Sequence, residues 1–180
     1  MKAVLSYLLA VGGLGMMLFA LSAVAGRFRY GVARGMVLHL MRTNPHQAEA
    51  MCKADKGTFM EAIAAAWKNA VMLKMRDPKI LAQASQPSYD AQCKQVELHW
   101  KTVMKRVKTA AGLGVGAVAL AIAASTSPIL HILLAVATLC GCGWVVAYKL
   151  DVDRSLVLAR AELLPELIRS IAEGRYQLPP

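Results

Sequence analysis

Few side chains in the apolar parts of this chain can do chemistry, and only one of them can exchange a proton near neutral pH. Three segments are apolar almost throughout: 3–25, 109–124 and 129–148. None of them contains Asp, Glu, Lys or Arg, so His131 is the only candidate for proton chemistry within them. Thr138 lies in the third segment, and Ser125 and Thr126 lie in the turn before it. Their hydroxyl groups could line a hydrated path together with His131.

These polar residues are too few for a complete proton path. A bare hydroxyl does not titrate near neutrality, and His131 follows Pro128 by three residues, near one end of its segment. If the chain takes part in proton conduction, another protein must therefore supply the titrating carboxylate. The alternative for Thr138 is a packing role, in which its hydroxyl bonds to the backbone carbonyl three or four residues earlier.

Other kinds of site have no support in the sequence. Cys140 and Cys142 form a C-x-C pair whose side chains would point about 200° apart on a helix, which suits packing better than chelation. Cys52 and Cys93 lie in the part that we expect to be cytoplasmic, where thiols stay reduced. No phosphate-binding loop, zinc-protease motif or nucleophile elbow is present. We therefore predict no metal site, no cofactor and no enzymatic activity.

The apolar segments have the lengths of membrane helices. Segment 3–25 would extend about 35 Å as a helix, and about 20 residues suffice to cross a hydrocarbon core. The sequence Ala23-Val24-Ala25 resembles a signal-peptidase site, but the apolar run before it exceeds the usual signal core of about 7 to 15 residues. We interpret the segment as a retained transmembrane helix, and the alternative is cleavage after Ala25.

The distribution of charge predicts the orientation of these helices. The net charge is +10, and residues 26–108 contain fifteen Lys or Arg against six Asp or Glu. Basic residues beside apolar segments stay on the cytoplasmic side, so we expect the N-terminus outside and the C-terminus inside. Sidedness and attraction to anionic lipids explain the basic surplus, and nucleic acid binding is not needed to account for it.

Between the first and second apolar segments, the sequence predicts short helices separated by turns. The first helix is expected to run on through "RFRYGVARGMVLHLMR" until "TNP", where Asn44 and Pro45 begin a short helix. Thr58 and Glu61 form a capping-box pattern that opens a further helix. The "DP" pair at Asp77 and Pro78 predicts another short turn.

Two long helices are expected to follow. Apolar residues recur at intervals of four and three, as in a coiled coil, at Tyr89, Cys93, Val96, Trp100, Val103 and Val107. This pattern predicts one helix from about Ser88 to Ala124, with Trp100 and Val103 buried against another helix. The third span should continue beyond the membrane until Pro165 ends or restarts it.

The sequence thus predicts an all-α membrane protein with three transmembrane helices, the last two extended into a cytoplasmic helical bundle. The expected divisions are a first transmembrane helix, a cytoplasmic helical insert, a transmembrane hairpin and a cytoplasmic C-terminal tail, at 1–25, 26–108, 109–148 and 149–180. Two pairs of small residues, Gly112 with Gly116 and Ala137 with Gly141, allow helices to approach closely. They could pack the hairpin on itself or contact another subunit.

This layout resembles the MotA/TolQ/ExbB proton-channel family. The stretch "RTNPHQAEAMCKADKGTFMEAIAAAWKNA" is similar to the cytoplasmic loop of the family, and "AVATLCGCGWVVAYKLDVDR" resembles its last span. The resemblance implies a homo-oligomer in the bacterial inner membrane, around a single-span partner that carries an intramembrane Asp. It also implies that Thr138 corresponds to the pore-lining threonine of that span.

Two hypotheses from different classes remain open at this stage. In the first, the chain is a ring-forming subunit of an ion-driven, energy-transducing complex. In the second, it is a membrane scaffold or assembly subunit that moves no ion. The topology favours the first hypothesis. The second segment, "GLGVGAVALAIAAS", lacks the threonine that the family carries there, which favours the second.

Overall fold

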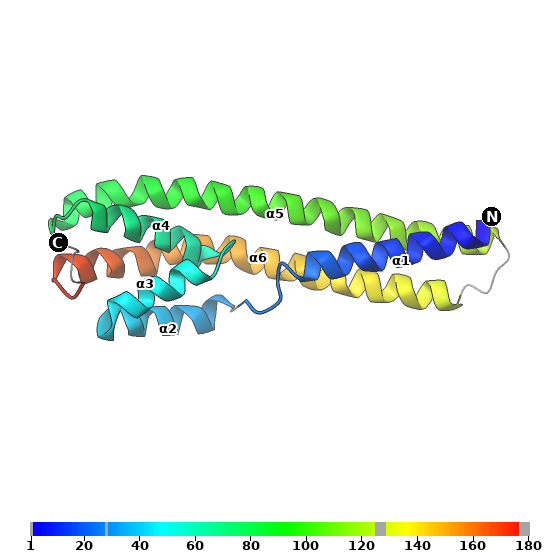
Figure 1. Ribbon diagram of the computed structural model, residues 1–180, viewed down its shortest axis with the longest axis horizontal. Helices are drawn as coiled ribbons and strands as arrows, with labels where there is room; N and C mark the ends of the chain where they lie inside the picture. Colours follow the sequence, from blue (N-terminus) through cyan, green and yellow to red (C-terminus); the bar gives the residue numbers. More distant parts are fainter. Residues whose placement is uncertain (1, 28, 125–128, 177–180) are drawn as a thin grey trace. The chain divides into compact units, whose positions relative to one another are not determined.

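The regular structure of this protein is helical. The computed structural model describes residues 2–27, 29–124 and 129–176, and this part of the chain contains six α-helices and no strand (Figure 1). In chain order the helices are α1 (Lys2–Leu21), α2 (Tyr30–Thr43), α3 (Pro45–Ala54), α4 (Phe59–Met72), α5 (Pro78–Ala123) and α6 (Ile129–Ala172). The predicted helical class is therefore confirmed.

Three of these helices, α1, α5 and α6, are long and apolar enough to cross a membrane. α1 has 20 residues, which corresponds to about 30 Å of helix and matches a hydrocarbon core. α5 and α6 have 46 and 44 residues, so each extends well beyond the length that a bilayer requires. The prediction of three candidate spans, two of them on unusually long helices, is confirmed.

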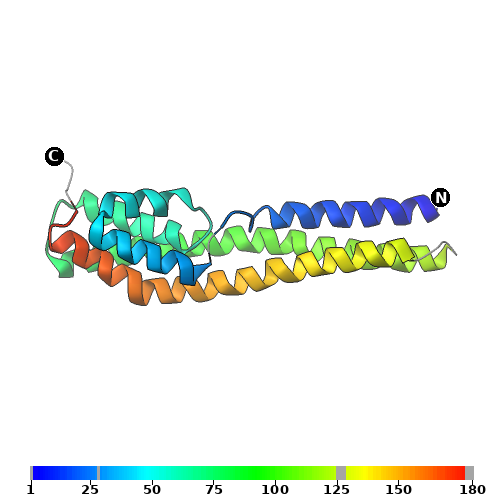
Figure 2. The same cartoon turned by 90° about the horizontal axis from the view of Figure 1, so that it is seen from below.

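The chain divides into two compact units. Unit 1 contains residues 1–26 and 100–150, and unit 2 contains residues 27–99 and 151–180. Unit 1 is a three-helix bundle of α1 with the apolar parts of α5 and α6 (Figure 2). Unit 2 packs α2, α3 and α4 with the remaining parts of the two long helices, around a core that includes Trp67 and Leu163.

The first helix ends earlier than the sequence suggested. α1 stops at Leu21, and α2 starts at Tyr30, so the expected continuous helix through "RFRYGVARG" was wrong. Gly26 adopts a φ of 74°, a left-handed conformation that glycine tolerates and that does not continue a helix. The small residues before it, which resemble a cleavage site, form a hydrogen-bonded turn in which Val24 N donates to Leu21 O.

α5 starts ten residues before the predicted position, so the expected short turn at Asp77 and Pro78 was wrong. Asp77 caps the helix by accepting a hydrogen bond from the Lys79 N–H at 2.8 Å, and Pro78 occupies the first helical position. Pro87 lies inside the helix and weakens its bonding to carbonyls one turn earlier. Beside the proline, the side-chain amide of Asn69 on α4 donates to Ala84 O at 2.7 Å and to Ser88 Oγ at 2.8 Å, which ties α4 to α5.

The predicted caps of α3 and α4 in unit 2 agree with the structure, but the expected break at Pro165 was wrong. Asn44 and Pro45 open α3, and the Asn44 side chain accepts a hydrogen bond from Gln47 N. Thr58 caps α4 by accepting from Met60 N, while Glu61 accepts from the Gly57 N–H at 2.6 Å. Pro165 neither ends nor restarts the last helix, because α6 continues through it to Ala172.

Candidate functional site

Thr138 lies on the inner face of α6 in unit 1. Its side chain is fully buried, and its hydroxyl donates to Leu134 O, four residues earlier, at 2.8 Å. The methyl side of Thr138 faces Gly114 of α5, where an added Cβ would lie 3.7 Å from the threonine Cγ2. The hydroxyl is thus satisfied within its own helix, and the side chain fills the space opposite a glycine.

His131 occupies the same face of α6, two turns before Thr138. Its ring is fully buried in unit 1, and its Nε2 lies 3.1 Å from Ser6 Oγ of α1. The ring of Tyr7 lies beside it, with ring centroids 4.3 Å apart. This cluster joins α1 to the start of α6 through polar contacts in an otherwise apolar bundle.

The remaining predicted pore candidates, Ser125 and Thr126, lie outside the described residues. Of the four side chains that the sequence indicated for an ion path, the structure therefore places two, Thr138 and His131. Both point into the bundle of their own chain. The contact between His131 and Ser6 could not be anticipated from sequence, because only the fold brings together residues 125 positions apart.

Of the glycines indicated by sequence, Gly141 lies at a close contact between helices of unit 1, whereas Gly112 and Gly116 do not. Gly13, which the sequence did not single out, lies at another such contact. An added Cβ at Gly13 of α1 would lie only 3.2 Å from Ala110 O and from Gly114 N of α5. A Cβ at Gly141 would overlap the side chain of Met17. By contrast, Gly112 and Gly116 have no neighbour within 4 Å of an added Cβ among the described residues. Their small surface therefore remains available on the outside of the bundle.

The two packing residues indicated on α5 are buried. Trp100 and Val103 are each 1% exposed, and the Trp100 ring lies 5.7 Å from the ring of Tyr148 on α6, measured between centroids. The buried residues of α5 in unit 1 continue at intervals of three and four: Val103, Val107, Ala110, Gly114, Ala117 and Ala121. The heptad spacing thus describes the packing of α5 within the chain.

α6 carries a second set of residues with the same spacing, and sequence reasoning missed it. These residues are all exposed, and we call them the outer seam: Ile129, Leu133, Val136, Cys140, Gly143, Ala147, Leu150, Arg154, Val157 and Ala161. The intervals alternate between four and three, and nine of the ten residues are apolar or glycine. Because nearly every residue of the span is apolar, hydrophobicity alone could not reveal this pattern.

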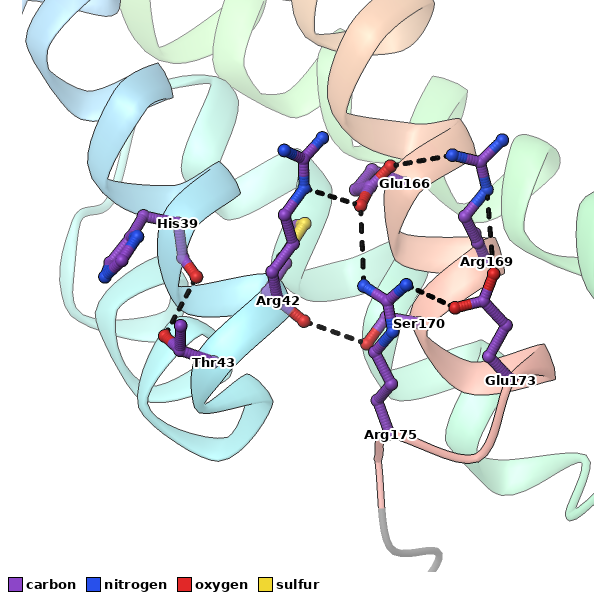
Figure 3. A network of polar contacts seen from close by, with 9 residues as sticks. His39, Arg42, Thr43, Glu166, Arg169, Ser170, Glu173 and Arg175 are labelled. Carbon is purple, nitrogen blue, oxygen red and sulfur yellow. Dashed lines mark hydrogen bonds and ion pairs between the residues drawn. The ribbon is translucent and has the colours of Figure 1, made fainter.

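A polar network anchors the end of the chain in unit 2 (Figure 3). The buried Glu166 of α6 accepts a hydrogen bond from Arg42 Nε of α2 at 3.0 Å, and the guanidinium groups of Arg169 and Arg175 lie within 4 Å of it. Ser170 Oγ also donates to Met41 O at 3.2 Å. Three arginines thus converge on one carboxylate and connect α2, α6 and the segment that follows α6.

Neighbouring side chains in unit 2 are held in their neutral forms. Burial raises the pKa of the Cys52 thiol to about 12, with a further contribution from the charges of Glu49 and Asp55. Burial and a hydrogen bond donated to Glu49 raise the pKa of the Tyr176 hydroxyl. Cys52 is therefore a neutral packing thiol at physiological pH, and a reactive role has no basis here.

The structure offers no evident centre for metal chemistry. Among residues 2–27, 29–124 and 129–176, no three His, Cys, Asp or Glu side chains come together in a way that could hold a metal ion. No family model, curated protein or solved structure matches this chain. The functional interpretation therefore depends on the chain's own helices and surfaces.

Proposed function

We propose that this chain is a ring-forming subunit of an ion-driven, energy-transducing complex in a bacterial inner membrane. The single observation that carries the proposal is the outer seam of α6. Copies of one membrane protein share the same orientation, so their α6 helices can pack side by side and parallel around a common axis. A repeat of apolar residues at intervals of three and four is the pattern that such helix packing requires.

Lipid alone does not account for the outer seam. Within residues 129–148, exposed residues outside the seam, such as Ile132, Leu139 and Trp144, are apolar too, and lipid chains could cover this whole surface. The seam, however, continues past Tyr148, where charged residues begin, and Leu150 and Val157 there are 61% and 71% exposed. Two large apolar side chains exposed in a polar segment favour a protein partner at this surface.

The composition of the seam favours close packing between identical helices. Cys140, Gly143, Ala147 and Ala161 are small, and small residues let membrane helices approach closely. Gly112 and Gly116 on α5 add further small surface that this chain leaves uncovered. A second copy that approaches α6 could therefore contact α5 as well.

The ion-conducting part of the proposal requires a second protein. Residues 1–26 and 100–150 contain no Asp or Glu, so a carboxylate in the path would come from a partner with a single span. Together with the resemblance of the layout to the MotA/TolQ/ExbB family, this supports a ring that encloses such a partner. Anionic lipids would interact with the basic residues beside the spans.

A non-conducting scaffold is the second candidate, and one observation favours it. The Thr138 hydroxyl is already bonded to Leu134 O and faces the interior of its own bundle. A ring built on the outer seam could therefore hold other proteins without moving ions. The two candidates differ in whether the assembled complex performs ion-dependent work.

Native mass spectrometry of the complex extracted in mild detergent tests the proposal. We expect a defined oligomer for the wild-type chain, and dissociation to smaller species for Leu150→Glu and Val157→Glu, since each places a charge in the seam outside the apolar segment. Met72→Glu is the matched control, because Met72 is 65% exposed on α4 and lies outside the seam. A monomeric wild-type chain, or equal dissociation of the Met72→Glu control, would exclude the seam as the interface.

A further inference from the structure

We infer that His131 Nδ1 is a proton-binding site that controls the contact between α1 and α6. This inference goes beyond the proposed function, because it concerns the interior of one chain and holds for a channel or a scaffold. It depends on three features of the cluster: the tautomer of His131, the lack of a partner for Nδ1, and the charges nearby.

The hydrogen bonds of Ser6 determine the tautomer of His131. The Ser6 hydroxyl donates its proton to Ala3 O, with 2.7 Å between the oxygen atoms. Since a serine has one hydroxyl proton, Ser6 Oγ can only accept in its 3.1 Å contact with His131 Nε2. His131 Nε2 therefore carries a hydrogen, and in the neutral ring Nδ1 has a free lone pair.

That lone pair is buried without a hydrogen-bond donor. His131 is fully buried, and Nδ1 has no partner within the described part of the chain. The ring of Tyr7 packs against the imidazole from α1. Buried polar atoms are rarely left unpaired, because each one costs free energy. A bare imidazole nitrogen can accept a proton from solution.

No negative charge within unit 1 would stabilise the protonated ring. The ionisable groups that α1 presents near His131 are Tyr7 and, one turn before Ser6, Lys2. α5 has no charged side chain from Thr109 to Ala123, and α6 has none before Lys149. All the charged residues in 1–26 and 100–150 are basic. An imidazolium at this position would therefore be a buried cation without a counter-charge.

Protonation changes this contact without breaking the bond to Ser6. A proton from solution binds the Nδ1 lone pair, and the neutral imidazole becomes an imidazolium while the Nε2–H group still donates to Ser6. The new N–H group and its charge then require water. Water reaches them when the start of α1 separates from α6, so proton binding and helix separation are linked.

The tautomer and the proton binding can be measured directly. We would record nitrogen-15 spectra of the histidines of the full chain in detergent micelles from pH 8 to pH 5, and assign His131 from the signals lost in His131→Gln. We expect protonated Nε2 and bare Nδ1 at pH 8, and protonation of Nδ1 on acidification. A hydrogen on Nδ1 at pH 8, or a ring that stays neutral down to pH 5, would overturn the inference.

Hydrogen exchange then tests the link to helix separation. His131→Gln is the matched variant, because the glutamine amide can donate to Ser6 Oγ but cannot take up a proton. For the amides of α1, we compare the exchange rate in the wild type with the rate in His131→Gln. We expect this ratio of rates to rise on acidification by up to about tenfold per pH unit, because the opening is linked to the binding of one proton. An unchanged ratio between pH 8 and pH 5 would contradict the inference.

A second variant keeps the test decisive if His131→Gln fails to fold. Ser6→Ala removes the acceptor of Nε2–H and leaves His131 in place. In this variant we expect His131 to lose its preference for the Nε2–H tautomer. We also expect the amide hydrogens of α1 to exchange rapidly already at pH 8. Retention of both the wild-type tautomer and slow exchange would show that Ser6 does not hold the ring, and would overturn the inference.

Discussion

The inner and outer faces of α6 share the same spacing of apolar residues, but only the inner face is covered by the chain itself. The inner face in unit 1 consists of His131, Ala135, Thr138, Cys142 and Val145. These residues pack against α1 and α5, whereas the outer seam begins two residues earlier and is exposed along its length. A helix with two such faces is suited to both an intramolecular and an intermolecular contact.

The difference between the faces shows how one helix can serve two kinds of packing. On the buried side of α6, the hydroxyl groups of Thr138 and Ser155 bond within the helix, to Leu134 O and Val152 O. His131 bonds instead to Ser6 of α1. On the outer face, the residues of the seam are exposed, and all of them except Arg154 are apolar or glycine. The inner face therefore specifies the fold, and the outer face is free to specify an assembly.

The largest effect on stability is expected when we compare two tryptophans of unit 1, one buried and one exposed. Trp100 is 1% exposed, whereas Trp144 on α6 is 58% exposed. Trp100→Ala should destabilise the chain by about 3 to 5 kcal/mol, because it leaves a cavity in the bundle. Trp144→Ala should change the stability of the monomer far less. Thermal unfolding of both variants in detergent measures the difference, and equal losses would refute the distinction between the covered and the exposed side chains of unit 1.

A smaller effect is expected at the far end of α6, where the buried Glu166 faces three arginines. Glu166→Gln removes the carboxylate and leaves the arginines to repel one another. We expect a loss of about 1 to 2 kcal/mol, less than for a fully buried pair, because the guanidinium groups are partly exposed to water. Denaturant unfolding of unit 2 measures this loss by circular dichroism.

Asp90→Asn is the control for this prediction. Asp90 pairs with Arg160 at 3.3 Å, and both side chains are about half exposed. Exposed pairs of this kind contribute between about 0 and 1 kcal/mol. A loss for Glu166→Gln no greater than for Asp90→Asn would mean that the network of Figure 3 adds little to stability.

The sequence predicts those parts of the architecture that depend on interactions between residues close together in the chain. Helix type, the long α5 and α6, and the caps at Asn44 and Thr58 follow from local patterns and were predicted correctly. The break after Leu21 was missed, because small apolar residues continue up to Gly26, and no local signal in the sequence marks the turn that they form before the positive φ of Gly26. Pro87 misled the prediction, because α5 continues through it, and the contacts of Asn69 with Ala84 O and Ser88 Oγ beside it come from another helix.

The parts of the site that sequence could not supply are pairings between helices. The motif "GLGVG" contains three glycines, and the middle one, Gly114, contacts α6, whereas the outer two are uncovered. All three residues are glycine, so only the tertiary arrangement distinguishes the covered one from the two uncovered ones. The partner of His131 likewise depends on which residue of α1 lies opposite, and this follows from the packing of the bundle.

The smallest effect on stability is expected at Thr138, where the two functional candidates differ. Thr138→Val keeps the shape of the side chain and removes a hydroxyl whose bond contributes about 0.6 kcal/mol or less in a membrane. Assembly should therefore remain normal. A conducting role predicts loss of the ion-dependent work of the complex, whereas a scaffold predicts full activity. Thr109→Val serves as the control, because the exposed Thr109 hydroxyl also bonds within its own helix, to Lys105 O.

The most direct test of the outer seam uses two cysteines that the chain already contains. Cys140 is exposed on the outer seam, and Cys142 is buried on the inner face. If α6 helices pack around a common axis, mild oxidation of native membranes should link copies through Cys140. Because Cys93 is only half-buried, it is replaced by Ala in all three chains. In this background we predict covalent dimers for the otherwise wild-type chain and for Cys142→Ala, and their loss in Cys140→Ala. Dimers that persist in Cys140→Ala, or no dimers in any of the three chains, would contradict the assembly through α6.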